Sequence, residues 1–164
     1  MNDLIGEKKN PGSLEGLLLQ VGSDTLLVPM TSVSEIIEER PSVSRTSSSK
    51  AWLHGWFDWR NQYIPLLAFE GLEGVGPIPL TEASQVVIFN AIGAAAERGF
   101  FALAIDGLPR PVRLSEEQEL PTVPAPERNG IAFALSMEGK TLLVPDLGYL
   151  EQLSIETVAD GTIA

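Results

Sequence analysis

The segment TLLVP occurs twice in this chain, at residues 25–29 and again at residues 141–145. Each copy follows a polar, turn-forming triplet, GSD at residues 22–24 or EGK at residues 138–140, and an apolar run stands before each triplet. Each copy ends at a proline, which prevents it from continuing as a central strand. The pattern predicts two β-hairpins with TLLVP as the second strand, and a three-residue loop in the first. Five matching residues do not establish a duplicated domain.

Much of the remaining chain also has the character of short β-strands, because it is rich in Val, Ile and aromatic residues. Strand-forming runs occupy residues 51–59, 62–69, 85–91 and 100–105. Arg60 and Asn61 separate the first two runs and predict a tight turn. Residues 108–114 form a weaker strand, and Pro109 and Pro111 place it at a sheet edge. Turn signals at intervals of about 8 to 12 residues predict an all-β barrel or sandwich with a few short helical pieces.

Two segments carry helix signals. Ser32 and Glu35 have the spacing of a capping box, which predicts one helical turn followed by a strand within residues 32–39. Asp146 is placed as the N-cap of a short helix that carries leucines on one face. Loop signals mark residues 40–50, 71–79 and 116–128, and the Gly- and Pro-rich middle one is the best candidate for a boundary between two lobes. The tails, residues 1–13 and 157–164, are expected to be flexible.

The composition is that of an ordinary globular protein. Of 164 residues, 44% are hydrophobic and 20% charged, which argues against wholesale disorder. The absence of cysteine excludes disulfides and thiolate metal sites. A net charge of −11 repels phosphate at long range, so nucleic acid is not an expected partner. The apolar runs are too short to span a bilayer and the first residues lack a signal peptide, so we expect a cytoplasmic protein without direct membrane insertion.

Catalytic signals are weak in this sequence. His54 is the only histidine, and a structural imidazole beside aromatic residues is a simpler interpretation than a general base. No spacing of His, Asp or Glu predicts a metal site. Gly71, Gly74 and Gly76 superficially resemble a phosphate loop, but no Lys-Ser or Lys-Thr follows, and prolines interrupt the segment. We therefore expect no catalytic residue, no metal and no cofactor, and a binding or scaffold protein is favoured over an enzyme.

Four segments, taken in order, suggest a family. They are VPMTSVSEI at residues 28–36, HGWFDWRNQYIP at 54–65, AIDGL at 104–108, and NGI at 129–131 ahead of the second hairpin. Their order and spacing resemble the CheW-like coupling proteins of bacterial chemosensory arrays, over residues 14–153. No single motif is strong, and the specificity lies in the combination.

The resemblance implies a fold and a class of partner. Members of this family are non-enzymatic adaptors built from two small five-stranded β-barrels that pack together. They tie the cytoplasmic tips of methyl-accepting chemoreceptors to the regulatory domain of a CheA-type histidine kinase. A single domain over residues 14–153 is therefore expected, with a first lobe at about 14–70 and a second at about 84–144, the exact exchange of strands between the lobes being left open.

The resemblance also carries over individual positions. Glu35 matches the family's acidic residue, Arg60 its arginine and Gly55 the glycine before that arginine; the first two are expected to pair at the receptor-facing surface. An incidental surface pair is the competing interpretation, and its energy would be below about 1 kcal/mol. Three other positions match family positions linked to receptor or kinase contact: Val33, Leu108 and Gly130. Apolar residues such as Val33 and Leu108 are, however, more often core.

Several residues of this sequence differ from the family pattern, and these differences bear on which partners the protein binds. Asn61 replaces the glycine that follows the family arginine, and Asn tolerates the left-handed conformation of a turn. Trp52, Trp56, Phe57 and Trp59 replace mostly aliphatic residues; they would be interface anchors if exposed and core residues if buried, with core favoured for Trp56. These changes favour a divergent coupling protein, such as one of a type IV pilus system. An adaptor for a response regulator or a pilus-regulatory protein, and a small ligand-binding barrel or enzyme that uses His54, are the alternatives.

Overall fold

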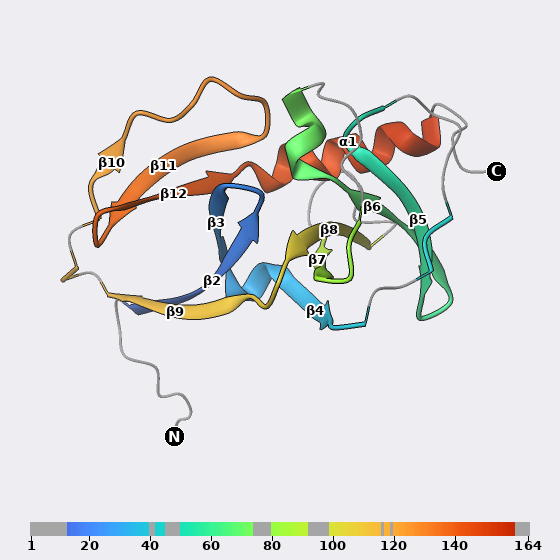
Figure 1. The fold of residues 1–164 in the computed structure, drawn as a ribbon, viewed down its shortest axis with the longest axis horizontal. Coiled ribbons are helices and arrows are strands. Elements are labelled where there is room, and N and C mark those ends of the chain that lie inside the picture. Colours follow the sequence, from blue (N-terminus) through green and yellow to red (C-terminus); the bar gives the residue numbers. More distant parts are fainter. Residues whose placement is uncertain are drawn as a thin grey trace.

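The computed structural model describes residues 13–39, 42–44, 50–73, 80–91, 99–115, 117–118 and 120–159. Most of its regular structure is β-strand (Figure 1). The strands are β2 (Ser13–Val21), β3 (Asp24–Pro29), β4 (Val33–Ile37), β5 (Leu53–Trp59), β6 (Gln62–Leu67), β7 (Ser84–Asn90), β8 (Phe100–Asp106), β9 (Arg110–Ser115), β10 (Thr122–Val123), β11 (Ile131–Met137) and β12 (Lys140–Pro145). Two 3-10 turns, η1 (Met30–Ser32) and η2 (Phe69–Glu73), and one helix, α1 (Leu147–Ala159), complete the set.

The strands form two sheets, which lie side by side in Figure 1. One sheet has the order β10-β11-β12-β3-β2-β9, and the other has the order β4-β7-β8-β6-β5. The all-β class is confirmed. The sheets have six and five strands, however, and backbone hydrogen bonds among the described residues close neither of them into a barrel. β9 and β10 remain edges of the first sheet, and β4 and β5 remain edges of the second.

The two TLLVP strands, β3 and β12, are neighbours in the six-stranded sheet. They pair in parallel, with Leu26 opposite Leu143. This pairing joins the first hairpin to the last one, so the six-stranded sheet combines the two ends of the described chain, while residues 33–106 supply the five-stranded sheet. The expected lobes at 14–70 and 84–144 therefore do not correspond to the sheets, since the break at residues 71–79 falls inside the five-stranded one.

Most of the local predictions hold, with shifts of a few residues. Both TLLVP hairpins form, but the first loop has two residues rather than three, because Val21 pairs with Asp24 across Gly22 and Ser23. The strand at residues 110–115 lies at a sheet edge, as its prolines predicted. The short strand β10, within the expected loop at 116–128, was not predicted, since only two residues pair with β11.

Both predicted helical segments differ from the expectation at their ends. The helical turn near Ser32 lies before β4, and the Ser32 hydroxyl donates to the Pro29 carbonyl at 2.7 Å, so no capping box with Glu35 forms. Asp146 caps α1 as predicted, because the Tyr149 amide donates to its Oδ1 at 3.1 Å. The helix extends to Ala159, into the expected flexible tail.

The buried side chains form three clusters. The largest lies between the sheets, where alternate residues of both sheets meet the leucines of α1; it includes Leu19, Leu26, Phe89, Leu103 and Leu150. Leu18, Leu27 and Leu142 form a second cluster on the opposite face of the six-stranded sheet, because successive strand residues point to opposite faces. A third cluster, built around Phe57, Trp59 and Ile88, lies on the opposite face of the five-stranded sheet.

Candidate partner-binding surface

The predicted pairing of Glu35 with Arg60 is confirmed. Arg60 Nη2 lies 3.0 Å from Glu35 Oε1, and the side chains are 67% and 38% exposed, respectively. Glu35 belongs to β4 and Arg60 to the turn after β5, which are the two edge strands of the five-stranded sheet. The pair therefore connects opposite edges of one sheet, and it is accessible to a partner.

The turn that carries Arg60 is a tight two-residue hairpin loop. Trp59 pairs with Gln62, and both loop residues have left-handed backbones, with φ of 52° at Arg60 and 62° at Asn61. Two left-handed residues define the type I′ turn, whose twist matches that of the flanking strands. Asn61 thus adopts the left-handed conformation expected of it, and the tight turn forms.

Trp59 is the residue whose part in this site the sequence did not reveal. Its indole Nε1 donates to Glu35 Oε1 at 2.9 Å, and the guanidinium carbon of Arg60 lies 4.6 Å from the centre of its ring. The side chain is only 6% exposed. Because side chains alternate between the two faces of a strand, its position in β5 predicts that the side chain points inward. No local pattern, however, indicates that the indole N–H donates a hydrogen bond to a residue more than twenty positions earlier in the chain.

Gly55 is buried and holds a neighbouring segment close to β5. The backbone of Ser44 pairs with Trp56 in both directions, at 2.7 and 3.0 Å. Gly55 has φ of 146°, and a Cβ there would collide with the Ser44 carbonyl oxygen and lie 2.9 Å from Val43 Cγ1. The geometry therefore explains Gly55 by backbone packing; a direct contact of this residue with a partner remains a prediction.

Of the other three predicted contact residues, Val33 shares strand β4 with Glu35, and Leu108 and Gly130 lie outside the strands of the pair. Val33 is half-buried and packs against the core between the sheets. Gly130 is buried, with φ of 89°, and a Cβ there would lie 2.6 Å from Leu72 Cδ1. Leu108 is 66% exposed in the loop between β8 and β9, so the interpretation of this residue as core is wrong. Their roles in partner contact remain predictions.

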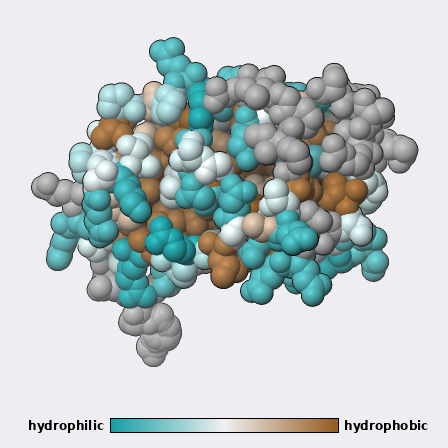
Figure 2. Space-filling model, in the orientation of Figure 1, coloured by the Kyte–Doolittle hydropathy of each residue, from teal (hydrophilic) through white to brown (hydrophobic). Residues whose placement is uncertain are grey.

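The aromatic residues of β5 belong mainly to the core. Trp56, Phe57 and Trp59 are 2%, 1% and 6% exposed, which confirms the expectation for Trp56. Trp52 is half-buried, with Lys50 Nζ 5.4 Å from the centre of its ring. Within the described part of the chain, the exposed large apolar side chains are Leu14, Tyr63, Leu108 and Phe133. Figure 2 shows hydrophobic residues interspersed with hydrophilic ones on the face in view.

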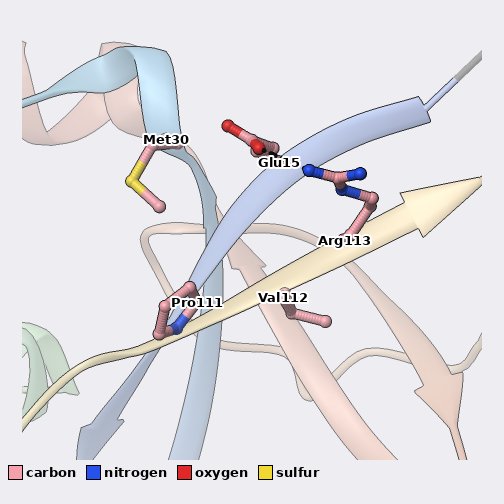
Figure 3. A pocket seen from close by; sticks show the side chains of 5 residues that line it. All are labelled: Glu15, Met30, Pro111, Val112 and Arg113. Atoms are coloured by element: carbon pink, nitrogen blue, oxygen red, sulfur yellow. Dashed lines mark hydrogen bonds and ion pairs between the residues drawn. The ribbon is translucent and has the colours of Figure 1, made fainter. Parts of the chain in front are cut away.

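A surface pocket of about 260 Å³ lies over β2 and β9, away from the pair. It is lined by Glu15, Met30, Pro111, Val112 and Arg113 (Figure 3). Arg113 Nη2 and Glu15 Oε2 form an exposed ion pair at 3.1 Å across its rim. His54, the candidate general base, does not line this pocket and is itself buried. Among the residues that the structure describes, no group of His, Asp and Glu could hold a metal ion.

Acidic side chains meet where the first hairpin contacts the five-stranded sheet. The Gly22 amide donates to Asp106 Oδ2 at 2.8 Å, and Asp24 accepts from Arg128 Nη2 at 2.7 Å. Burial raises the pKa of Glu70 beside them; the negative charges of Asp106 and Asp24 raise it further, although a backbone hydrogen bond acts in the opposite direction.

No helix among the described residues is long and apolar enough to cross a membrane.

Comparisons with known proteins agree with this architecture. The family model described as the CheW-like domain matches residues 15–153 of the chain. A similar solved structure is the crystal structure of the scaffolding protein TtCheW from Thermoanaerobacter tengcongensis, with a TM-score of 0.68 and 14% sequence identity. The alignment covers 84% of this chain and 91% of that one, and at this identity it shows likeness of fold. A search of curated proteins found no match.

Proposed function

This chain belongs to the family of CheW-like domains, and on that basis we propose that it is a non-enzymatic adaptor of bacterial chemosensory signalling. In this role residues 14–153 form one unit that couples the cytoplasmic tip of a methyl-accepting chemoreceptor to the regulatory domain of a CheA-type histidine kinase. The protein would work in the cytoplasm, associated with receptor arrays through its partners. A type IV pilus system is the proposed setting on the divergence of the sequence from the family pattern alone, since the aromatic residues of β5 are buried and present no surface to a particular partner.

The observation that carries this proposal is the exposed Glu35–Arg60 pair. The two residues match the acid and the arginine of the family motifs, and the fold brings them within 3.0 Å of each other from opposite edges of one sheet. Coupling between a receptor and a kinase requires surface contacts that transmit a change in geometry, and it requires no catalysis. An accessible, oriented ion pair provides such a contact.

The test is a binding experiment with two charge reversals, Arg60→Glu and Glu35→Lys. Both are expected to abolish co-purification with a receptor cytoplasmic fragment or a kinase regulatory domain, because each places like charges side by side. Arg60→Glu removes an exposed ion pair worth under about 1 kcal/mol and a ring contact worth about 0.5 to 1 kcal/mol, so its melting temperature should fall by no more than about 8 °C. Glu35→Lys also removes the acceptor of the Trp59 N–H, so it is expected to melt lower than Arg60→Glu.

The ion pair of Arg113 with Glu15 provides a matched control. It has nearly the same length, 3.1 Å, and its arginine is 66% exposed, but it lies on the six-stranded sheet. Arg113→Glu is therefore expected to leave binding unchanged. Intact binding in Arg60→Glu and Glu35→Lys would refute the assignment of this surface. Capture of a response regulator or pilus-regulatory protein without any kinase would instead favour the alternative adaptor, and loss of substrate turnover in His54→Ala would favour the enzyme.

A further inference from the structure

Trp59 contacts both members of the exposed pair while being buried itself. Its Nε1 donates to Glu35 Oε1 at 2.9 Å, the same oxygen that accepts from Arg60 Nη2 at 3.0 Å. The guanidinium group of Arg60 lies over the indole ring, 4.6 Å from its centre, a cation–π geometry. Each of the three side chains thus contacts the other two.

The indole is a rigid platform for these contacts. It belongs to the cluster around Phe57, and Phe100 packs against it edge-on, with ring centres 4.6 Å apart. A side chain buried among close-packed neighbours is restricted to one rotamer. The indole N–H and the ring face therefore stand in fixed positions relative to the edge strands.

The backbone of Arg60 points to a role for its side chain. Its φ of 52° is unfavourable for a residue with a Cβ, and Asn, Asp or Gly is usual at this turn position. Conformations of this kind persist where the surroundings over-determine them. The strand pairing of Trp59 with Gln62 imposes the turn, and the ion pair and the ring contact add to what holds Arg60 here.

We propose that Trp59 is a positioning residue, which fixes Glu35 and Arg60 in the single arrangement that the partner recognises. This inference rests on the proposed adaptor function. Both described hydrogen bonds converge on Oε1, so Oε2 and the other guanidinium N–H groups are left for a partner. A segment that presents a hydrogen-bond donor next to a carboxylate or carbonyl acceptor fits this arrangement. Fixing the pair before binding lowers the entropy cost of forming the complex.

Trp59→Phe tests this role, and Trp56→Phe is its matched control. Both changes keep an aromatic ring in a buried position of β5, but the Trp56 Nε1 has no hydrogen-bond partner among the residues that the structure describes. Calorimetric titration with a receptor cytoplasmic fragment and a kinase regulatory domain is expected to show about a tenfold loss of affinity for Trp59→Phe. Trp56→Phe should stay within about twofold of the wild type. Unchanged affinity in Trp59→Phe, or equal losses in the two variants, would overturn the inference.

A second measurement needs no partner. The chain has three tryptophans, so a nitrogen–proton correlation spectrum contains three indole signals, which the Trp→Phe variants assign. Glu35→Ala is expected to move the Trp59 indole signal and leave that of Trp56 in place, and Trp59→Phe is expected to increase the mobility of the Arg60 Nε. If neither change occurs, Trp59 does not position the pair. If the wild type binds neither fragment, the proposed function fails by itself, while these spectra still decide whether Trp59 fixes the pair.

Discussion

Gly55→Ala offers a quantitative test of how β5 is built. A Cβ at this position collides with the Ser44 carbonyl oxygen, so the segment at residues 43–44 must move away from the strand. That movement breaks the two backbone hydrogen bonds between Ser44 and Trp56, at about 0.5 to 1.5 kcal/mol each. The residue also has φ of 146°, which costs about 1 to 3 kcal/mol once a Cβ is present.

These contributions together predict a loss of about 2 to 6 kcal/mol in the free energy of unfolding. For a protein of this size each kcal/mol lowers the melting temperature by about 2 to 4 °C, so thermal unfolding followed by circular dichroism should show a decrease of at least about 4 °C. Hydrogen exchange should also lose protection at the amides of Ser44 and Trp56. Melting within about 2 °C of the wild type would refute the steric argument.

Gly139→Ala separates the steric cost from the backbone cost. Gly139 has φ of 79°, and a Cβ there would meet nothing within 4 Å. Only the cost of placing a residue with a Cβ at a positive φ applies, so we expect the free energy of unfolding to fall by about 1 kcal/mol. If Gly55→Ala and Gly139→Ala destabilise equally, the collision with Ser44 is not what requires glycine at position 55. If Gly55→Ala also weakens partner binding, we expect that loss to occur together with the loss of the backbone hydrogen bonds between Ser44 and Trp56, because the added Cβ displaces this segment.

Two further predictions concern electrostatics and capping. Burial and the charges of Asp106 and Asp24 raise the pKa of Glu70. Over the pH range between the two pKa values, the Glu70 carboxyl is therefore protonated in the native state and ionised in the unfolded chain. The contribution of Glu70 to stability thus falls as the pH rises through the raised pKa. Glu70→Gln should therefore melt higher than the wild type near neutral pH, with a gain that shrinks towards about pH 4 in melting curves recorded across pH; a gain independent of pH would contradict this. Asp146→Ala removes the acceptor of the Tyr149 amide and should cost about 1 kcal/mol in chemical denaturation. Asp146→Asn is its control, because Asn caps as well as Asp, and an equal loss in both would exclude the cap as the cause.

Local features of the fold could be predicted from the sequence because their causes are local. Gly22, Arg60-Asn61 and Gly139 mark turns, and the apolar runs beside them are strands, so each hairpin follows from its own residues. The proline at the end of each TLLVP copy ends a strand in the structure as well. Asp146 caps the helix for the same reason, since its side chain acts within one turn.

Long-range pairing could not be predicted in this way. Nothing within residues 25–29 indicates that β3 lies beside β12, because the parallel pairing depends on the packing of both hairpins over a shared core. The same applies to Gly55 and Gly130, whose need for glycine comes from segments that fold against them. The Glu35–Arg60 pairing was predicted only through the family resemblance, and the hydrogen bond from Trp59 was missed because alternation predicts the direction of a side chain and not its partner.

The parallel contact between β3 and β12 has a consequence for the order of folding. The strands of the five-stranded sheet come from one continuous stretch, residues 33–106, so all of them have been synthesised once the ribosome has passed Asp106. The six-stranded sheet cannot be completed until β12 emerges, so the first hairpin keeps one edge open while the middle of the protein is made. An open edge of this kind can pair with another chain. Truncation before Lys140 should therefore leave β3 as a template for aggregation, although residues 33–106 are intact.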